Sequence, residues 1–74
     1  MNQDLFEETL RKYVRRKPFF PFLVELLDGK VIIVDRPVVI GGGGATFISE
    51  DDNWIEFNCE DVRDIRTMPA ESVL

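Results

Sequence analysis

Four basic side chains near the N-terminus are the best candidates for chemistry in this chain. Arg11, Lys12, Arg15 and Arg16 lie within six consecutive positions. Guanidinium and ammonium groups that cluster in this way bind phosphate oxygens, so the cluster predicts a contact surface for phosphate groups. The alternative is that these cations complement the C-terminal end of a helix dipole and keep the chain soluble.

The distribution of charge along the chain concerns the same surface. Residues 1–20 carry five basic and three acidic side chains, which gives a net charge of +2. Residues 21–74 carry four basic and eleven acidic side chains, which gives −7 and a total of −5. A polyanion is therefore attracted to the N-terminal part and repelled by the remainder. This argues against a broad nucleic-acid surface, and nothing indicates specificity for DNA.

The side chains that enzymes use most often are scarce. The chain has no histidine, the commonest general base, and its single cysteine, Cys59, has no histidine to activate it. Adjacent acids such as Glu50 and Asp51 point to opposite sides of an extended chain, so they do not form a catalytic pair. We therefore predict that the protein is not an enzyme and has no catalytic residue.

Two short segments invite a comparison with ligand-binding loops. The run Gly41–Gly44 lacks the Lys-Ser/Thr or the glycine spacing of phosphate-binding loops, and this favours a flexible connection between strands. The acidic run at 50–53 lacks the glycine and the distal glutamate of a calcium loop, which favours a solvated turn. One cysteine without histidine is also too little for a zinc site. We predict no metal and no cofactor.

The basic cluster requires a helix to position it. Asn2 is a suitable N-cap, and apolar residues follow at three- and four-residue spacing, so a helix is predicted over about 3–15. Pro18 ends it, because the residue before a proline avoids the helical conformation.

Five short strands are predicted after the helix. Asp28-Gly29 separates two strand-forming runs and is a strong signal for a hairpin. The second strand ends at Pro37, and Val38–Ile40 is a candidate continuation of it. The expected strands cover about 22–27, 30–35, 45–49, 54–58 and 62–68. The predicted fold is mainly β with one N-terminal helix, in which a five-stranded antiparallel sheet closes into a small SH3-like barrel.

The aromatic side chains have two interpretations. They could stack on bases, but aromatic residues at strand spacing more often belong to a core or an interface. The residues concerned are Phe19, Phe20, Phe22, Phe47, Trp54 and Phe57.

The length of 74 residues predicts one domain with a small core. Chains of this size bury only about 60% of the surface that the unfolded chain exposes, so association through edge strands into a homo-oligomer is expected. No stretch reaches the ~18 apolar residues of a membrane span, and residues 1–10 lack the pattern of a signal peptide. A lone thiol fits a reducing compartment, so we predict a cytoplasmic protein.

The order of these elements and several short segments resemble the bacterial Sm-like proteins of the Hfq family. The segments that carry this resemblance are Gln3–Phe6, Thr9–Lys12, Phe22–Lys30, Trp54–Phe57 and Val62–Thr67. Members of the family begin with a short amphipathic helix and continue into a five-stranded barrel, which closes into a ring with uridines bound at its pore. The chain also resembles a group of small bacterial proteins with the pattern Arg-Lys-Pro-Phe-x-Pro-Phe, found here at Arg16–Phe22, and this likeness implies no function.

The resemblance to the Hfq family implies a set of RNA contacts. Gln3 lies near the pore-facing glutamine of that family, and Arg11, Lys12 and Arg15 lie near its arginine-rich rim. Asn58 and Cys59 stand where the family has a lysine-histidine pair at the pore.

Two hypotheses about function follow. The first is RNA binding, with the possible contacts Gln3, Arg11, Lys12, Arg15 and Arg16. The alternative is an oligomeric protein–protein interaction or scaffold module without a nucleic-acid role.

Overall fold

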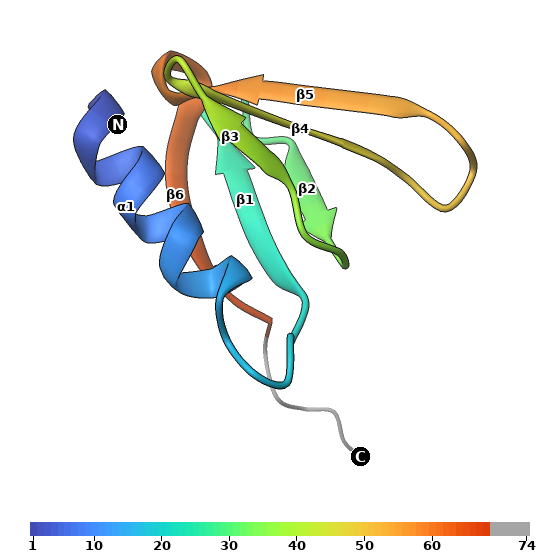
Figure 1. Ribbon diagram of the computed structural model, residues 1–74. Coiled ribbons are helices and arrows are strands. Elements are labelled where there is room, and N and C mark those ends of the chain that lie inside the picture. Colours follow the sequence, from blue (N-terminus) through green and yellow to red (C-terminus); the bar gives the residue numbers. More distant parts are fainter. Residues whose placement is uncertain (69–74) are drawn as a thin grey trace.

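Two three-stranded antiparallel sheets and one α-helix form the fold of residues 1–68, which are the residues that the computed structural model describes (Figure 1). The elements, in order, are α1 (Gln3–Val14), β1 (Phe22–Leu26), β2 (Val31–Val34), β3 (Val39–Gly41), β4 (Gly44–Ile48), β5 (Trp54–Asn58), the 3₁₀ helix η1 (Cys59–Asp61) and β6 (Val62–Thr67). The predicted helix and the five predicted strands are confirmed with small shifts at their ends, and β3 is an additional strand.

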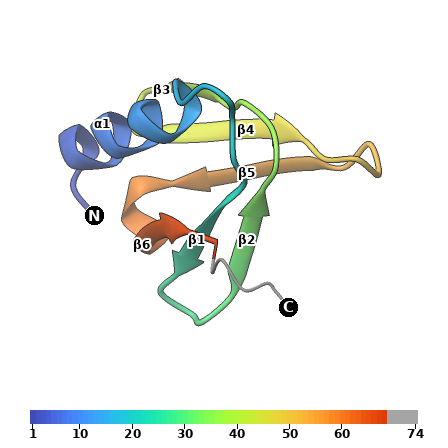
Figure 2. The same cartoon turned by 90° about the horizontal axis from the view of Figure 1, so that it is seen from below.

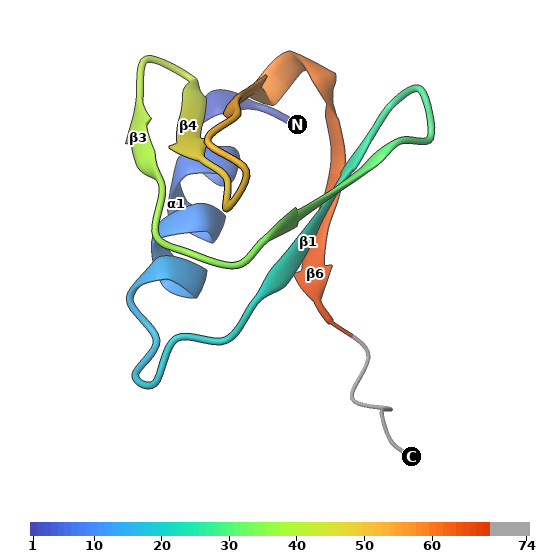
Figure 3. The ribbon, with the colours of Figure 1, turned by 90° about the vertical axis from the view of Figure 1, so that its right-hand side faces the viewer.

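The prediction of a five-stranded barrel is wrong. The six strands of the described part of the chain form two separate sheets, with the orders β2-β1-β6 (sheet A) and β3-β4-β5 (sheet B), and neither sheet closes on itself. Figure 3 shows the strands of sheet B beside α1 and those of sheet A on the other side of the molecule.

Two connections explain the separation of the sheets. Pro37 has no backbone N–H to continue a ladder, and Val39–Gly41 pairs with β4 instead of extending β2 along β1. After β5, the turn of 3₁₀ helix at η1 redirects the chain, so that β6 pairs with β1 in sheet A. The predicted continuation of the second strand is therefore a new strand in the other sheet.

The N-terminal helix begins and ends close to the predicted positions. The side chain of Asn2 caps it, because its Oδ1 accepts a hydrogen bond of 2.8 Å from the N–H of Leu5. Phe6 and Leu10, four residues apart on one face, are fully buried. This apolar face positions the helix, which contacts β3 and η1, and leaves the basic side chains on the opposite face.

One apolar core joins the helix and both sheets. Its buried members are Phe6, Leu10, Phe22, Val24, Val34, Ala45, Phe47, Phe57, Val62 and Ile65. The molecule measures 37 × 25 × 24 Å along its principal axes. Figures 1 and 2 show the turn between β4 and β5 projecting away from the other elements, on the side opposite α1.

Candidate functional site

The predicted phosphate-binding side chains gather on the C-terminal half of α1. Arg11, Lys12 and Arg15 are exposed and, together with Glu8, line a groove of about 500 Å³ on the helix surface. The groove carries three cations and one carboxylate. The structure therefore brings together three of the five residues that the sequence nominates for RNA contact.

The three cations of the groove are not equally free to bind a partner. Arg11 Nη2 lies 3.2 Å from Glu7 Oε1, in an ion pair between successive helical turns. Within residues 1–68, Lys12 and Arg15 form no ion pair. An anionic partner would thus interact mainly with Lys12 and Arg15.

The other two nominated residues lie outside the groove. The guanidinium carbon of Arg16 lies 4.7 Å from the centroid of the Tyr13 ring, which is the geometry of a cation–π contact. Gln3 belongs to the first turn of the helix, and its Nε2 donates a hydrogen bond of 3.3 Å to Oε2 of Glu7. The five residues therefore do not form one continuous surface.

Gln3 borders a separate polar pocket of about 210 Å³. Its lining residues are Gln3, Gly42, Gly43, Asn58, Cys59 and Glu60. The pocket has a carboxylate and no cation among these side chains, so it lacks a group that attracts phosphate. The lysine-histidine pair that the resemblance implies at this place is replaced by Asn58 and Cys59.

The four-glycine run forms the tight turn between β3 and β4. Gly41 pairs with Gly44, and Gly42 and Gly43 have positive φ values of 61° and 81°, as a two-residue hairpin turn requires. The run connects two strands, as the sequence predicts, and its first and last glycines belong to β3 and β4 themselves. The N–H of Gly43 donates a hydrogen bond of 2.9 Å to Oε2 of Glu7, so this amide already has an anionic partner within the chain.

The carboxylate of Glu7 joins the helix to this turn. Its side chain is only 15% exposed and accepts hydrogen bonds from Gly43, Gln3 and Arg11. The bond from the Gly43 amide is the main cause that lowers the pKa of Glu7 below its usual 4.5, with smaller contributions from Gln3 and Arg11 and an opposing effect of partial burial. Glu7 is thus a structural anion, and sequence reasoning missed this role because its partner is distant in the chain.

Cys59 has a structural position in the backbone. It is half-buried, and its N–H donates a hydrogen bond of 2.8 Å to the carbonyl oxygen of Gly43. No group of three or more Cys, Asp or Glu side chains within residues 1–68 is arranged to hold a metal ion. The single α-helix of that part of the chain is too short and too polar to cross a membrane.

Exposed apolar side chains lie on strands of both sheets, and sequence reasoning assigned those of β2 to no surface. Val31 and Ile33 on β2 are 49% and 54% exposed, and Trp54 at the start of β5 is 68% exposed. A signal for Trp54 exists in the sequence, because strand alternation puts it on the same face as Glu56 and Asn58. That face points away from the core, which is lined by the intervening residues of β5.

Comparison of the chain with protein-family models, with curated proteins and with solved structures finds no match. The resemblance to the Hfq family therefore stays a prediction from short segments of sequence. Two surfaces of the described residues are candidates for function: the basic groove on α1 and the strands with exposed apolar side chains at the sheet edges.

Proposed function

We propose that the protein is a non-enzymatic interaction module that binds further copies of itself through the open edges of β2 and β5. The exposed apolar residues Val31, Ile33 and Trp54 carry this proposal. Within residues 1–68, β2 pairs only with β1, and β5 pairs only with β4. An open edge presents unpaired backbone N–H and C=O groups, and an apolar open edge is a template for pairing with another chain.

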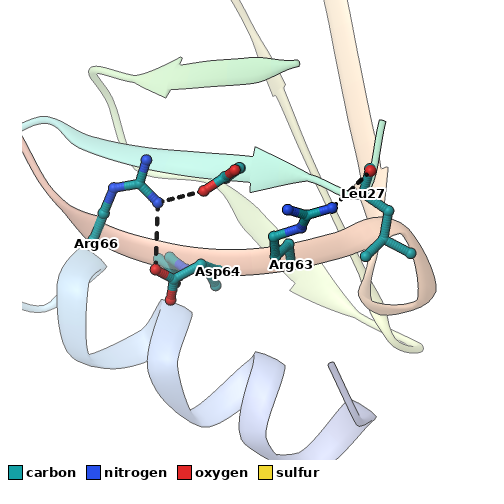
Figure 4. Close-up of polar contacts among 6 residues, drawn as sticks. Leu27, Arg63, Asp64 and Arg66 are labelled. Carbon is teal, nitrogen blue, oxygen red and sulfur yellow. Dashed lines mark hydrogen bonds and ion pairs between the residues drawn. The ribbon is translucent and has the colours of Figure 1, made fainter. Parts of the chain in front are cut away.

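The other long edge strand, β6, is protected by charge. Arg66 Nη1 lies 2.7 Å from Glu25 Oε1 and 3.3 Å from Asp64 Oδ2. Figure 4 shows the contact between Arg66 and Asp64. In the same view, Arg63 Nη2 donates a hydrogen bond of 3.1 Å to the carbonyl oxygen of Leu27. Charged side chains along an edge disfavour pairing with a further strand. This contrast is the reason for choosing β2 over β6 in sheet A. In sheet B we choose β5, which has five residues, over the other edge strand, β3, which has three.

The size of the core supports the same proposal. Ten buried apolar residues form the core of the described chain, which is little for a domain of 74 residues. Covering the exposed residues of β2 and β5 would add apolar burial, which stabilises by about 25 cal/mol per Å².

The lone Cys59 supports the cytoplasm as the compartment, because cysteines there stay reduced.

Sedimentation velocity over a range of protein concentrations tests this proposal. The wild-type protein should form oligomers at micromolar concentration, and Ile33→Lys or Trp54→Lys should shift it toward the monomer, since each puts a charge on an apolar edge. Thr67→Lys, at an exposed position on β6, is the matched control and should associate like the wild type. A wild-type protein that stays monomeric at every concentration would refute the proposal.

RNA binding is the second candidate function, and the basic groove is the observation that favours it. Lys12 and Arg15 are its exposed cations without an ion pair in residues 1–68. If RNA binds there, the affinity for a short RNA should fall steeply with salt and fall further in the double variant Lys12→Ala, Arg15→Ala. Lys30→Ala, which removes an exposed cation from the β1–β2 turn, is the control. Fluorescence anisotropy with a labelled RNA measures both effects, and no binding at low salt would exclude this candidate.

A further inference from the structure

We infer that the groove on α1 binds the acidic turn between β4 and β5 of a second copy, so that copies associate head to tail. This inference rests on the self-association proposed above and adds a second contact to the pairing of strand edges, one that joins the groove to the turn. It assigns an occupant to the basic groove that is part of the same chain.

The groove offers cations to such a partner. Lys12 and Arg15 are exposed and form no ion pair within residues 1–68, whereas Arg11 is paired with Glu7. Glu8 also lines the groove and is its one carboxylate. The long aliphatic parts of the basic side chains give the groove apolar walls below their charged ends.

The turn between β4 and β5 offers the complementary charge. Glu50, Asp51 and Asp52 are consecutive and exposed, and no acid of this turn forms an ion pair within the described residues. Two backbone hydrogen bonds hold the turn in shape. The backbone N–H of Ser49 donates a bond of 2.9 Å to the carbonyl oxygen of Asn53, and the backbone N–H of Asp52 donates one of 2.9 Å to the carbonyl oxygen of Ser49. Three carboxylates are therefore presented together on an ordered turn.

Apolar side chains beside the turn match the groove as well. Ile48 and Trp54 pair across β4 and β5 at the base of the turn and are 51% and 68% exposed. An exposed indole is the ring that binds Lys and Arg side chains best. The turn thus combines carboxylates with an aromatic side chain. Lys12 and Arg15 of a second copy can form ion pairs with the carboxylates and cation–π contacts with the indole.

The arrangement of the molecule makes the contact intermolecular. Figures 1 and 2 show the turn projecting on the side opposite α1, so that it points away from the groove of its own chain. The groove of one copy is therefore free to bind the turn of another copy. Opposite charges at the two surfaces would steer the encounter and fix the orientation of the copies.

A charge-swap experiment tests the inference. The groove variant carries Lys12→Glu and Arg15→Glu, and the turn variant carries Glu50→Lys and Asp51→Lys. Asp52 is left unchanged because its φ of 63° disfavours a lysine. Circular dichroism checks that both variants fold, and sedimentation velocity measures association at low salt, where exposed charges are least screened.

Each variant alone should associate at least about tenfold more weakly than the wild type, because its groove and turn have the same sign. An equimolar mixture should recover association, since both contacts between unlike copies again join opposite charges, and high salt should weaken this recovery. A control mixture of the turn variant with the wild type should recover less association than the mixture of the two variants, because the basic turn of the variant still faces a basic groove on every copy.

Three results would overturn the inference. If the wild type associates and the two folded variants associate equally well, self-association through the strand edges stands but the groove takes no part in it. If the variants lose association and the mixture does not regain it, the groove and the turn do not contact each other. If the wild type is monomeric, both this inference and the proposed function fail.

Discussion

The amide of Gly43 donates a hydrogen bond of 2.9 Å to Oε2 of Glu7, and this contact fastens α1 to the turn between β3 and β4. The two residues are 36 positions apart in the chain. Because the acceptor is ionised, the bond is stronger than one between neutral groups and its strength depends on pH.

We expect Glu7→Gln to lower the free energy of unfolding at neutral pH and to have little effect in acid. The folded-state pKa of Glu7 lies below its usual 4.5, so the ionised carboxylate stabilises the fold fully above that value. This contribution is lost as the pH falls through the lowered folded-state pKa. Urea unfolding of wild type and variant across this range measures the difference, with the exposed Glu8→Gln as control. A difference that does not change with pH would show that the charge of Glu7 is unimportant.

Gly43→Ala should destabilise the fold by about 1–2 kcal/mol, the cost of a side chain in the left-handed conformation. Gly43 has a φ of 81°, and an added Cβ would lie 3.4 Å from Cδ of Gln3 and 3.5 Å from Sγ of Cys59. Gly41→Ala is the matched control, because its φ is not positive and nothing lies within 4 Å of its added Cβ. Chemical unfolding that gave equal stabilities for the two variants would contradict the assigned turn.

Phe6→Ala should cost about 3–5 kcal/mol, as is usual for removing a buried aromatic side chain. Phe6 is fully buried and meets Phe57 edge to face, with ring centroids 6.0 Å apart. This loss is comparable to the whole stability of a small domain, so the milder Phe6→Leu is needed to obtain a measurable transition. Leu5→Ala, at the neighbouring half-exposed position, should change the unfolding midpoint much less. Similar midpoints for Phe6→Leu and Leu5→Ala would argue against the packing of α1.

The fluorescence of Trp54 should report self-association directly. It is the only tryptophan of the chain and is 68% exposed, so its emission in dilute solution should be that of an indole in water. Burial at an interface would shift the emission to shorter wavelength as the protein concentration rises. The same titration of Ile33→Lys should show the shift only at higher concentration. An unchanged spectrum in a sample that sedimentation shows to be oligomeric would exclude Trp54 from the interface.

Local signals predicted most of the elements. The N-cap at Asn2, the stop at Pro18 and the hairpin at Asp28-Gly29 depend on neighbouring residues, and each is found where the sequence places it. The barrel was predicted wrongly because strand pairing is a long-range choice. The residues around Val39 do not determine whether that segment extends β2 or pairs with β4. It pairs with β4, and the strands are therefore divided between two sheets.

The candidate surfaces were predicted only where they depend on neighbouring residues of the sequence. The groove residues Arg11, Lys12 and Arg15 come together because helix periodicity fixes their relative positions. Gln3 was grouped with them by resemblance, but it lies at another pocket. The role of Glu7 depends on an amide in another element, which no local pattern reveals.

The division into two sheets has a consequence for the order of folding. The strands of sheet B form one uninterrupted stretch from Val39 to Asn58, so each of its pairings closes only a short loop. Sheet A is different, because Phe22 pairs with Thr67 and its third strand arrives only after the whole of sheet B. Closing that long loop costs more entropy than forming any of the three hairpins, β1–β2, β3–β4 and β4–β5. We therefore expect the hairpins of both sheets to form early and the docking of β6 onto β1 to complete the native state.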